Sequence, residues 1–382
     1  MGYEFSESQR KWFDATHDFA FDKLADDIAA RDARAEFWRE GYERCGKFGL
    51  LGLPVPPEFG GRGEKISTTV AALEGLGYAC PDAGLAFALS ASLWTVTMPI
   101  LVFGTDEQKR RWLPGLCDGS LFGANAASEP EAGSDIFGMQ TKAEKRGDQW
   151  VLNGRKIWIT GGPVADLYLV FASTEPGKGA LGITGFLVPK DTPGFQVVRD
   201  IPKLGLRTAP MGELAFEDCA LPGDALLGRQ GRGARIFNAA LEYERGAILA
   251  PALGTMRRQL ERCIEQARKR KQFGQPIGKF QAVSHRIADM RLRLETCRYM
   301  IYGYAGKKDT GTTDAALEAS MAKLHVSECY VQNSLDAVRI FGASGYSDEQ
   351  GLERHLRDSI GSVLFSGTND IQRNIIAQHL RI

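Results

Sequence analysis

The spacing of apolar side chains divides the chain into three segments with different periodicities. Residues 1–119 carry helical patterns, residues 120–228 carry strand patterns, and residues 229–382 return to long helical patterns. Apolar residues at every third or fourth position form a stripe on a helix, whereas alternating ones form a face on a strand. The pattern predicts a mostly α fold with an N-terminal helical domain, a middle β domain and a C-terminal helical bundle.

The first segment contains several candidate helices bounded by turn residues. The stretch SESQRKWFDATHDFAFDKL has an amphipathic period, with Phe13, Phe19 and Leu24 among its apolar positions. The stretches ISTTVAALEGLGYAC and AGLAFALSASLWTVTMPILVFG are apolar enough to form buried helices. Thr105 and Gln108 have the spacing of a capping box, which predicts the start of a further helix.

The middle segment consists of β-rich runs separated by short turns. In QWVLNGRKIWITGG the Asn153–Gly154 pair lies between two such runs and predicts a hairpin turn. The runs LYLVFAST, GITGFLVP, GFQVV and ELAFEDCAL follow at short spacing, which predicts a small antiparallel barrel or sandwich. GKGALG at 177–182 matches a dinucleotide-binding pattern, but no helix opens after it, so we interpret it as a hairpin loop.

The last segment predicts long amphipathic helices with short connections. The first is predicted to run without a break from RIFNAALEYER to EQARKRKQF. The second covers FQAVSHRIADMRLRLETCRYMIYGYAGKK, the third covers DAALEASMAKLHVSECYVQNSLDAVRIFG, and a last one begins near TNDIQRNIIAQHL. Four such helices predict a four-helix bundle.

Composition and charge exclude several classes of protein. The 47 basic and 47 acidic residues leave a formal net charge of zero, so no basic surface for nucleic acid is expected. No uninterrupted apolar run approaches the roughly 20 residues of a membrane span, and the N-terminus lacks the order of a signal peptide. The seven dispersed cysteines and five scattered histidines lack metal-ligand spacing, which predicts buried thiols in a reducing cytoplasm and no metal site.

Several polar motifs are candidates for a ligand site. ASEPEAGSDIFGMQTKA offers Ser128 and Ser134 as hydrogen-bond donors beside small residues, although a polar loop explains the stretch equally well. Trp158 and Thr160 alternate to one strand face, where they offer a stacking plane and a hydroxyl or else pack in the core. Arg270 in ARKRKQFGQPIGKFQ either complements a helix dipole or binds a phosphate.

Two carboxylates on the first C-terminal helix have different surroundings. Glu242 has Asn238 at i−4 and Arg245 at i+3, and we interpret it as a solvated or ion-paired surface charge. The helical neighbours of Glu244 are all apolar: Ala240, Leu241, Ala247 and Ile248. Desolvation on such a face raises the pKa of a carboxyl toward neutral, which suits a general base. The alternative for Glu244 is a partly exposed carboxylate at the edge of a core stripe.

Taken together, these segments resemble the acyl-CoA dehydrogenase family of flavoproteins. The resemblance covers essentially the whole chain and rests on motifs in family order and at family spacing: SEPEAGSD, NGRKIWITGG, RKQFGQPIGKFQ, IFGASGY, RHLRDS and SGTNDIQR. It implies the three domains predicted above and a homotetramer. It also implies FAD bound between the β domain and the bundle, with a neighbouring subunit contributing to the site.

The resemblance assigns most of the candidate residues to FAD. Those that would contact the flavin end and its phosphates, or line the isoalloxazine, are Ser128, Ser134, Trp158 and Thr160. Those that would serve the adenosine and pyrophosphate of a partner subunit's FAD are Arg270, Phe273 and Gln281. The remaining members of the FAD set are Arg339, Gly342, Thr368 and Asp370. Arg339 replaces the Gln of many members, and Ala343 replaces a common Gly, although an Arg near a pyrophosphate is chemically sensible.

The position of the catalytic carboxylate departs from the common pattern of that family. Most members carry it just before Gly-Thr, where this chain has Ser366. A minority, similar to isovaleryl- and long-chain-type dehydrogenases, place it in a Glu-Arg pair on the first bundle helix, here Glu244 and Arg245. The resemblance and the local pattern therefore agree on Glu244 as the base. The resemblance also implies that the Ser366 amide holds the thioester oxygen and that Arg245 and Gly367 line the substrate site.

The implied reaction is α,β-dehydrogenation of a small acyl thioester. Glu244 would remove the α-proton, and FAD would accept the β-hydride. The acyl group would be carried by CoA or by an acyl or peptidyl carrier protein, as in a branch of specialised metabolism, and an electron-transfer flavoprotein or oxygen would accept the electrons. Two alternatives stay open: a flavin-dependent oxidase or monooxygenase on the same scaffold, and a non-enzymatic flavoprotein scaffold.

Overall fold

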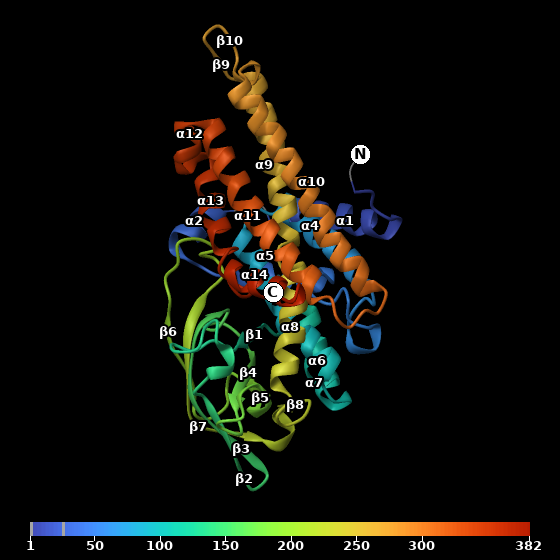
Figure 1. Ribbon diagram of the computed structural model, residues 1–382, viewed down its shortest axis with the longest axis vertical. Helices are drawn as coiled ribbons and strands as arrows, with labels where there is room; N and C mark the ends of the chain where they lie inside the picture. The colour runs from blue at the N-terminus through green and yellow to red at the C-terminus, as the bar shows by residue number, and fades with distance from the viewer. Residues whose placement is uncertain (1–2, 25–26) are drawn as a thin grey trace.

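The computed structural model describes residues 3–24 and 27–382, and its elements follow the three periodicities of the sequence. Figure 1 shows the sheet domain at one end and the long C-terminal helices reaching the other, with α8 between them. The predicted order of a helical region, a β region and a second helical region is confirmed. The fold class predicted from the apolar spacing is therefore correct.

The N-terminal region is built from helices whose ends carry the expected signals. Its elements are α1 (Glu7–Lys23), α2 (Ile28–Arg34), α3 (Arg39–Phe48), η1 (Pro57–Phe59), α4 (Ile66–Ala79), α5 (Ala83–Ser92), η2 (Leu93–Thr97), α6 (Met98–Phe103) and α7 (Asp106–Asp118). The predicted capping box at the start of α7 is present, because the Thr105 side chain accepts from Gln108 N and the Gln108 side chain accepts from Thr105 N. Ser6 and Gln9 make the same motif at α1.

The helical run of α5, η2 and α6 has the length of a membrane span, although serines and threonines interrupt its apolar sequence. Ala83–Phe103 forms 21 helical residues of mean hydropathy 1.8, long and apolar enough by length and composition to cross a bilayer. However, 83% of its most apolar window is buried inside the protein, with Leu89, Leu93 and Trp94 in the core. The stretch is therefore a core helix of this fold.

The middle region is one sheet with mostly antiparallel neighbours. Its elements are β1 (Gly123–Ala126), η3 (Ile136–Gly138), β2 (Lys142–Arg146), β3 (Gln149–Thr160), β4 (Leu167–Ser173), η4 (Gly179–Gly182), β5 (Ile183–Pro189), β6 (Phe195–Asp200), β7 (Met211–Pro222), η5 (Gly223–Ala225) and β8 (Leu226–Leu227). The strand order is β6-β7-β3-β2-β4-β5-β8, with β1 paired to β4. The β1–β4 and β2–β4 pairs are parallel, so the expectation of a purely antiparallel domain was too simple.

The hairpin predicted at Asn153–Gly154 is wrong. Both residues lie inside the continuous strand β3, where the register against β7 shifts between Leu152 and Gly154. Asn153 Oδ1 accepts a hydrogen bond of 2.8 Å from Asp218 N on the neighbouring strand, so the pair forms a β-bulge. The loop reading of GKGALG holds, because η4 connects the antiparallel neighbours β4 and β5.

The C-terminal region is a set of long helices packed around α11. Its elements are α8 (Gly233–Ala247), α9 (Ala250–Lys269), β9 (Lys271–Gln272), β10 (Gln275–Pro276), η6 (Ile277–Lys279), α10 (Gln281–Asp309), α11 (Ala316–Phe341), α12 (Ala343–Tyr346), η7 (Asp348–Gln350), α13 (Leu352–Gly361) and α14 (Asn369–His379). α11 contacts α8, α9, α10, α13 and α14. The predicted first bundle helix is split into α8 and α9, because Pro251 in the first turn of α9 has no N–H to continue the ladder.

Candidate active site

Glu244 lies on α8 at the junction of the three regions. α8 packs against η2, α6, β5 and α11, so its inner face is enclosed by all of them. Glu244 is only 8% exposed, as its apolar helical neighbours predict, and the alternative of a partly exposed carboxylate does not hold. Burial raises the pKa of Glu244 to about 7, while the Ser366 hydroxyl and the charges of Arg245 and Lys323 lower it in part. This carboxyl exchanges a proton near neutral pH.

Glu242, two positions earlier on α8, has a different environment. It is also buried, which corrects the interpretation of a solvated surface charge. Lys308 Nζ on α10 lies 2.7 Å from Glu242 Oε1, so the ion-paired reading of this residue holds with a partner that the helix pattern did not indicate. The same ammonium lies 4.5 Å from the ring centroid of Tyr243. Glu242 therefore forms a buried ion pair with Lys308 that joins α8 to α10.

The loop before α14 is held by its carbonyl oxygens. Ser366 and Gly367 have left-handed φ values of 60° and 81°. Arg245 Nε donates to Ser366 O at 3.1 Å, and Gln372 Nε2 donates to Gly367 O at 2.8 Å. Thr368 caps α14, because its side chain accepts from Ile371 N at 3.3 Å. Arg245, from the residue next to Glu244, therefore ties this loop to α8.

The amides of the same loop are free. Among the residues that the structure describes, the N–H groups of Ser366, Gly367 and Thr368 donate to no protein acceptor. Consecutive amides in such conformations form concavities that bind negative charge. The Ser366 hydroxyl is buried without a well-aligned hydrogen-bond partner, although it lies close enough to Glu244 to lower the pKa of that carboxyl. An orphaned hydroxyl and free amides beside a buried carboxyl indicate a ligand position.

Lys323 on α11 is a site residue that the sequence analysis missed. Its Nζ is fully buried and donates to Asn369 Oδ1 at 2.7 Å, and Ser327 Oγ donates to the same oxygen at 3.1 Å. Burial and the charge of Arg245 lower the pKa of Lys323 to about 7, while Glu244 raises it in part. The signal in the sequence was a lysine among small and apolar residues in EASMAKLHV, which helical spacing places inside the bundle.

The loop after β1 carries Ser128 and Ser134 and is organised by a buried ion pair. Lys156 Nζ lies 2.8 Å from Glu129 Oε1 and donates to Ala127 O at 2.9 Å. Glu129 also accepts from Thr141 N at 3.0 Å, so the two ends of the loop are joined. Burial lowers the pKa of Lys156 to about 8, although Glu129 opposes this effect. Ser128 is half-buried and Ser134 is exposed, so both hydroxyls remain accessible.

Trp158 and Thr160 share the open face of β3, as their alternation predicts. The intervening Ile159 is buried, whereas Trp158 is 50% exposed and Thr160 is half-buried. Trp158 has a left-handed φ of 58° within a register shift against β7, an unfavourable conformation for an aromatic residue. An exposed aromatic plane on a strained bulge is typical of a functional surface, and core packing does not explain it.

The candidates after α9 lie at the far tip of the helices. Figure 1 shows the β9–β10 hairpin at the opposite end of the molecule from the sheet domain. Phe273 and Gly274 form its turn with φ values of 52° and 78°, and the Phe273 side chain is 94% exposed. Arg270 and Gln281 flank this hairpin and are also exposed. Within one chain, these three residues do not meet Glu244.

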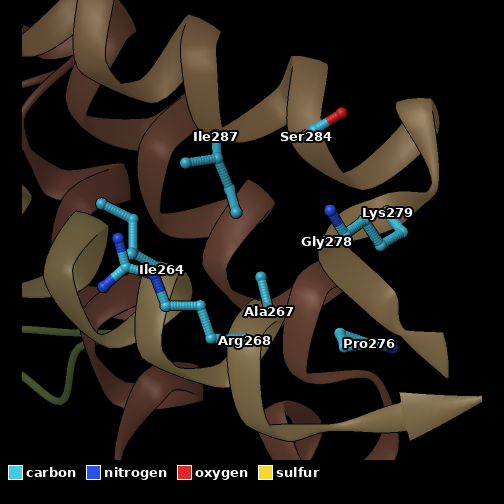
Figure 2. A pocket seen from close by; sticks show the side chains of 8 residues that line it. All are labelled: Ile264, Ala267, Arg268, Pro276, Gly278, Lys279, Ser284 and Ile287. Carbon is cyan, nitrogen blue, oxygen red and sulfur yellow. The ribbon is translucent and has the colours of Figure 1, made fainter.

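A cavity of about 360 Å³ lies at the base of that hairpin. Figure 2 shows that its lining comes from the end of α9, from η6 and from the start of α10: Ile264, Ala267, Arg268, Pro276, Gly278, Lys279, Ser284 and Ile287. The lining is mostly apolar and includes the cations Arg268 and Lys279, which suits a ligand with an apolar face and negative charge. The β9–β10 hairpin, which lies between the α9 and α10 parts of this lining, is at the far end of the molecule from the sheet domain.

The remaining candidates lie near helix ends. Arg339 is exposed in the last turn of α11, where its Nη1 lies 3.4 Å from Asp336 Oδ1. Gly342 ends α11 with a φ of 62° and has open space around the position of a Cβ. Asp370 is exposed in the first turn of α14 and lies 3.5 Å from Arg373. Arg339 and Gly342 therefore belong to the α11–α12 corner, whereas Asp370 follows the loop at Ser366.

Comparison with known proteins gives matches over nearly the whole chain. Family models of the N-terminal, middle and C-terminal domains of acyl-CoA dehydrogenase match residues 6–120, 124–219 and 231–381. The chain is 40% identical to the L-prolyl-(peptidyl-carrier protein) dehydrogenase of Pseudomonas fluorescens, with 100% of both chains covered.

Solved structures give the same result. The crystal structure of the prolyl acyl carrier protein oxidase AnaB superposes with a TM-score of 0.98 at 45% identity, over 99% of this chain and 100% of that chain. The structure of PigA with FAD and proline superposes with a TM-score of 0.97 at 41% identity, over 100% of this chain and 99% of that chain. With its three domains matched in order and relatives aligned from end to end, the chain belongs to the acyl-CoA dehydrogenase family.

Proposed function

We propose that this protein is an FAD-dependent dehydrogenase that removes an α-proton and a β-hydride from a small acyl thioester. The observation that carries the proposal is the buried Glu244 carboxyl, with a pKa of about 7, beside free backbone amides and an orphaned hydroxyl. A base with this pKa is matched to proton abstraction at neutral pH. Free amides nearby suit the oxyanion that forms when an α-proton leaves a thioester.

The residues present fit FAD. The exposed Trp158 plane and the half-buried Ser128 and Thr160 hydroxyls offer the apolar surface and the hydrogen bonds that an isoalloxazine needs. β1 lies beside η2, where Asn125 Nδ2 donates to Thr95 O at 3.4 Å, and η2 packs on α8. When bound, FAD supplies the acceptor for the β-hydride.

Glu244 performs the proton step in this proposal. Its ionised carboxylate takes the α-proton, and the enclosed face of α8 keeps water away from it. The amide of Ser366 donates to the thioester oxygen and stabilises its developing charge. Arg245 positions that amide by holding Ser366 O at 3.1 Å, so we assign Arg245 to the loop instead of to the substrate. Gly367 keeps the loop in its left-handed conformation.

The proposed substrate is a prolyl group held as a thioester on a carrier protein. Support comes from relatives that are 40% to 45% identical over the full chain and whose names specify prolyl carrier proteins. The position next to Gly367 is a serine, so no second carboxylate opposes the ionisation of Glu244 there. The alternative substrate is the same acyl group carried by CoA instead of by a carrier protein.

We further propose a homotetramer in which the hairpin tip completes a neighbour's FAD site. The support is that Phe273 is 94% exposed and that the β9–β10 hairpin, which Arg270 and Gln281 flank, lies at the other end of the molecule from the chain's own sheet domain. An exposed aromatic beside a guanidinium suits an adenine and a pyrophosphate. Arg339 and Gly342 are assigned to the same pyrophosphate, while Thr368 and Asp370 close the flavin end together with Ser134.

The electron acceptor defines a second candidate function. The relative AnaB is an oxidase by name, whereas the relative from Pseudomonas fluorescens is a dehydrogenase by name. An oxidase produces hydrogen peroxide in air, whereas a dehydrogenase needs a protein acceptor such as an electron-transfer flavoprotein. Peroxide release during turnover without added acceptor distinguishes the two.

The test is anaerobic mixing of the FAD-loaded enzyme with thioesters while the flavin absorbance is followed. We expect rapid bleaching with prolyl carrier protein, slower bleaching with prolyl-CoA and none with free proline. Glu244→Gln is expected to keep FAD but to bleach at least about 100-fold more slowly. Bleaching that requires NAD(P)H would indicate a monooxygenase instead. An enzyme that no thioester bleaches, or a variant that reacts at the wild-type rate, contradicts the proposal.

A further inference from the structure

A cluster of three metal-ligating side chains lies between α10 and α11, outside the proposed active site. Cys297 comes from α10, and His325 and Cys329 come from α11, one helical turn apart. Their ligand atoms all lie within 4.8 Å of one another. Cys297 is fully buried, Cys329 is nearly so, and His325 is half-buried. Because His325 and Cys329 are i and i+4 on one helix, both can reach one ion, in contrast to the expectation that the cysteines and histidines lack metal-ligand spacing.

From this geometry we propose that Cys297, His325 and Cys329 form a binding site for a thiophilic divalent cation, of which Zn²⁺ is the probe. In tetrahedral zinc sites, bonds of about 2.3 Å to sulfur and about 2.0 Å to nitrogen place the two ligand atoms about 3.5 Å apart. The distance between Cys329 Sγ and His325 Nε2 is 3.5 Å. The pair is therefore already spaced for a shared ion.

The charges around the cluster also suit a dication. Two thiolates and a neutral imidazole balance the charge of Zn²⁺, so the buried complex is neutral. The nearby guanidinium of Arg293 does not compete for the thiolates, because its Nη1 lies 2.8 Å from Asp336 Oδ2 and 3.0 Å from Asn333 Oδ1.

The hydroxyl of Thr296 adds a polar group beside the cluster. Thr296 Oγ1 lies 3.0 Å from His325 Nε2 and donates to Arg293 O at 3.0 Å. Because its one proton is used there, Thr296 accepts from the imidazole in this arrangement. On metal binding, Nε2 of the neutral imidazole becomes the ligand once its proton has moved to Nδ1, and the thiols of Cys297 and Cys329 release their protons to solvent. The fourth coordination position is then available to a water next to Thr296.

The bound ion would join two long helices at mid-length. α10 and α11 pack against each other, and α11 also carries Lys323 toward the loop before α14. His325 and Cys329 lie on a different side of α11 from Lys323 and Ser327, because helical neighbours two positions apart face away from each other. The proposed site is therefore a structural staple, and occupancy is expected to raise thermal stability while leaving the rate of flavin reduction unchanged.

The test uses the purified FAD-loaded enzyme, stripped of metal with a chelator and dialysed against buffered Zn²⁺. We expect one equivalent of zinc per chain by elemental analysis. Cys297→Ser, His325→Gln and Cys329→Ser are each expected to weaken binding at least about 100-fold. Cys263→Ser, which removes a buried thiol from α9 outside the cluster, is the matched control and is expected to bind as the wild type does.

A second measurement on the unmodified chain does not depend on how the variants fold. Zn²⁺ is expected to protect Cys297 and Cys329 from alkylation and to leave the reactivity of Cys263 unchanged. Less than half an equivalent of zinc, or equal binding by the cluster variants and the control, overturns the proposal. A Cys297–Cys329 disulfide found by mass spectrometry in the enzyme purified without reductant also overturns it, because the pair would then be a redox couple.

Discussion

Replacing Glu244 by Gln is expected to make the protein more stable at alkaline pH while removing its activity. The wild-type carboxyl is buried on α8, where burial raises its pKa from 4.5 to about 7. Glutamine has nearly the same shape and carries no charge at any pH. The variant therefore measures the free-energy cost of ionising the buried carboxyl while the packing around it stays nearly the same.

The size of the effect follows from the pKa difference. At about 1.4 kcal/mol per pKa unit, the step from 4.5 to about 7 corresponds to about 3 kcal/mol. Because the folded pKa is raised, this contribution to wild-type stability is fully present below pH 4.5 and is lost as the pH rises through about 7. Glu244→Gln should therefore gain relative to wild type across this window, by up to about 3 kcal/mol at pH 8.

The assay is urea unfolding at pH 5, 6, 7 and 8, at fixed protein and FAD concentrations. Glu242→Gln on the same helix is the matched control, because it removes the charge that pairs with Lys308 at 2.7 Å and leaves a buried ammonium without a carboxylate. That control is expected to be less stable than wild type at each of these pH values. A Glu244→Gln variant whose stability difference from wild type stays constant between pH 5 and pH 8 would refute the reasoning.

Three further variants probe the same site. Ser366→Ala removes the hydroxyl that lowers the pKa of Glu244, so the acid limb of the kcat/KM profile should move to higher pH. The rate on the plateau should change less than about threefold. An acid limb that does not move would contradict the influence of the Ser366 hydroxyl on Glu244. Lys323→Met removes a positive charge that lowers the pKa of Glu244, so the acid limb of the kcat/KM profile should also move to higher pH. A move of that limb to lower pH would mean that Lys323 raises the pKa of Glu244 and would contradict the prediction. Gly367→Ala places a Cβ 3.1 Å from Gln372 Nε2 at a φ of 81°, and calorimetry should show a loss of at least about 1 kcal/mol; unchanged stability would mean that the loop relaxes freely.

The elements that depend on local pattern were predictable from the sequence, and those that depend on neighbouring strands were not. The capping box at Thr105 and the periodic helices need only residues close in the chain. Asn153–Gly154 is a strong local signal for a turn, but pairing with Asp218 on β7 keeps the strand continuous and turns the same two residues into a bulge. At Asn153–Gly154, pairing between β3 and β7 therefore outweighed the local preference of the two residues for a turn.

In the candidate site, too, features set by nearby residues were predictable and features set by distant residues were not. The burial of Glu244 follows from four apolar neighbours on its own helix, so the sequence alone was enough. Lys323 is 79 positions away on another helix, and the bond from Arg245 to Ser366 O spans 121 positions. Contacts of this kind depend on how α8, α11 and the loop before α14 meet in space. The periodicity of one helix does not predict that the Arg245 guanidinium binds the carbonyl oxygen of Ser366.

The helix from Ala83 to Phe103 has a consequence for the synthesis of the protein. Its middle part, η2, is covered by α8, which begins about 130 residues later in the chain. At about 5–20 residues per second, a ribosome needs on the order of 10 s to supply that cover. During this interval the nascent chain presents a segment with the composition of a membrane anchor. A chain that terminates before α8 keeps that segment exposed, so incomplete translation products of this protein should aggregate or adhere to lipid bilayers.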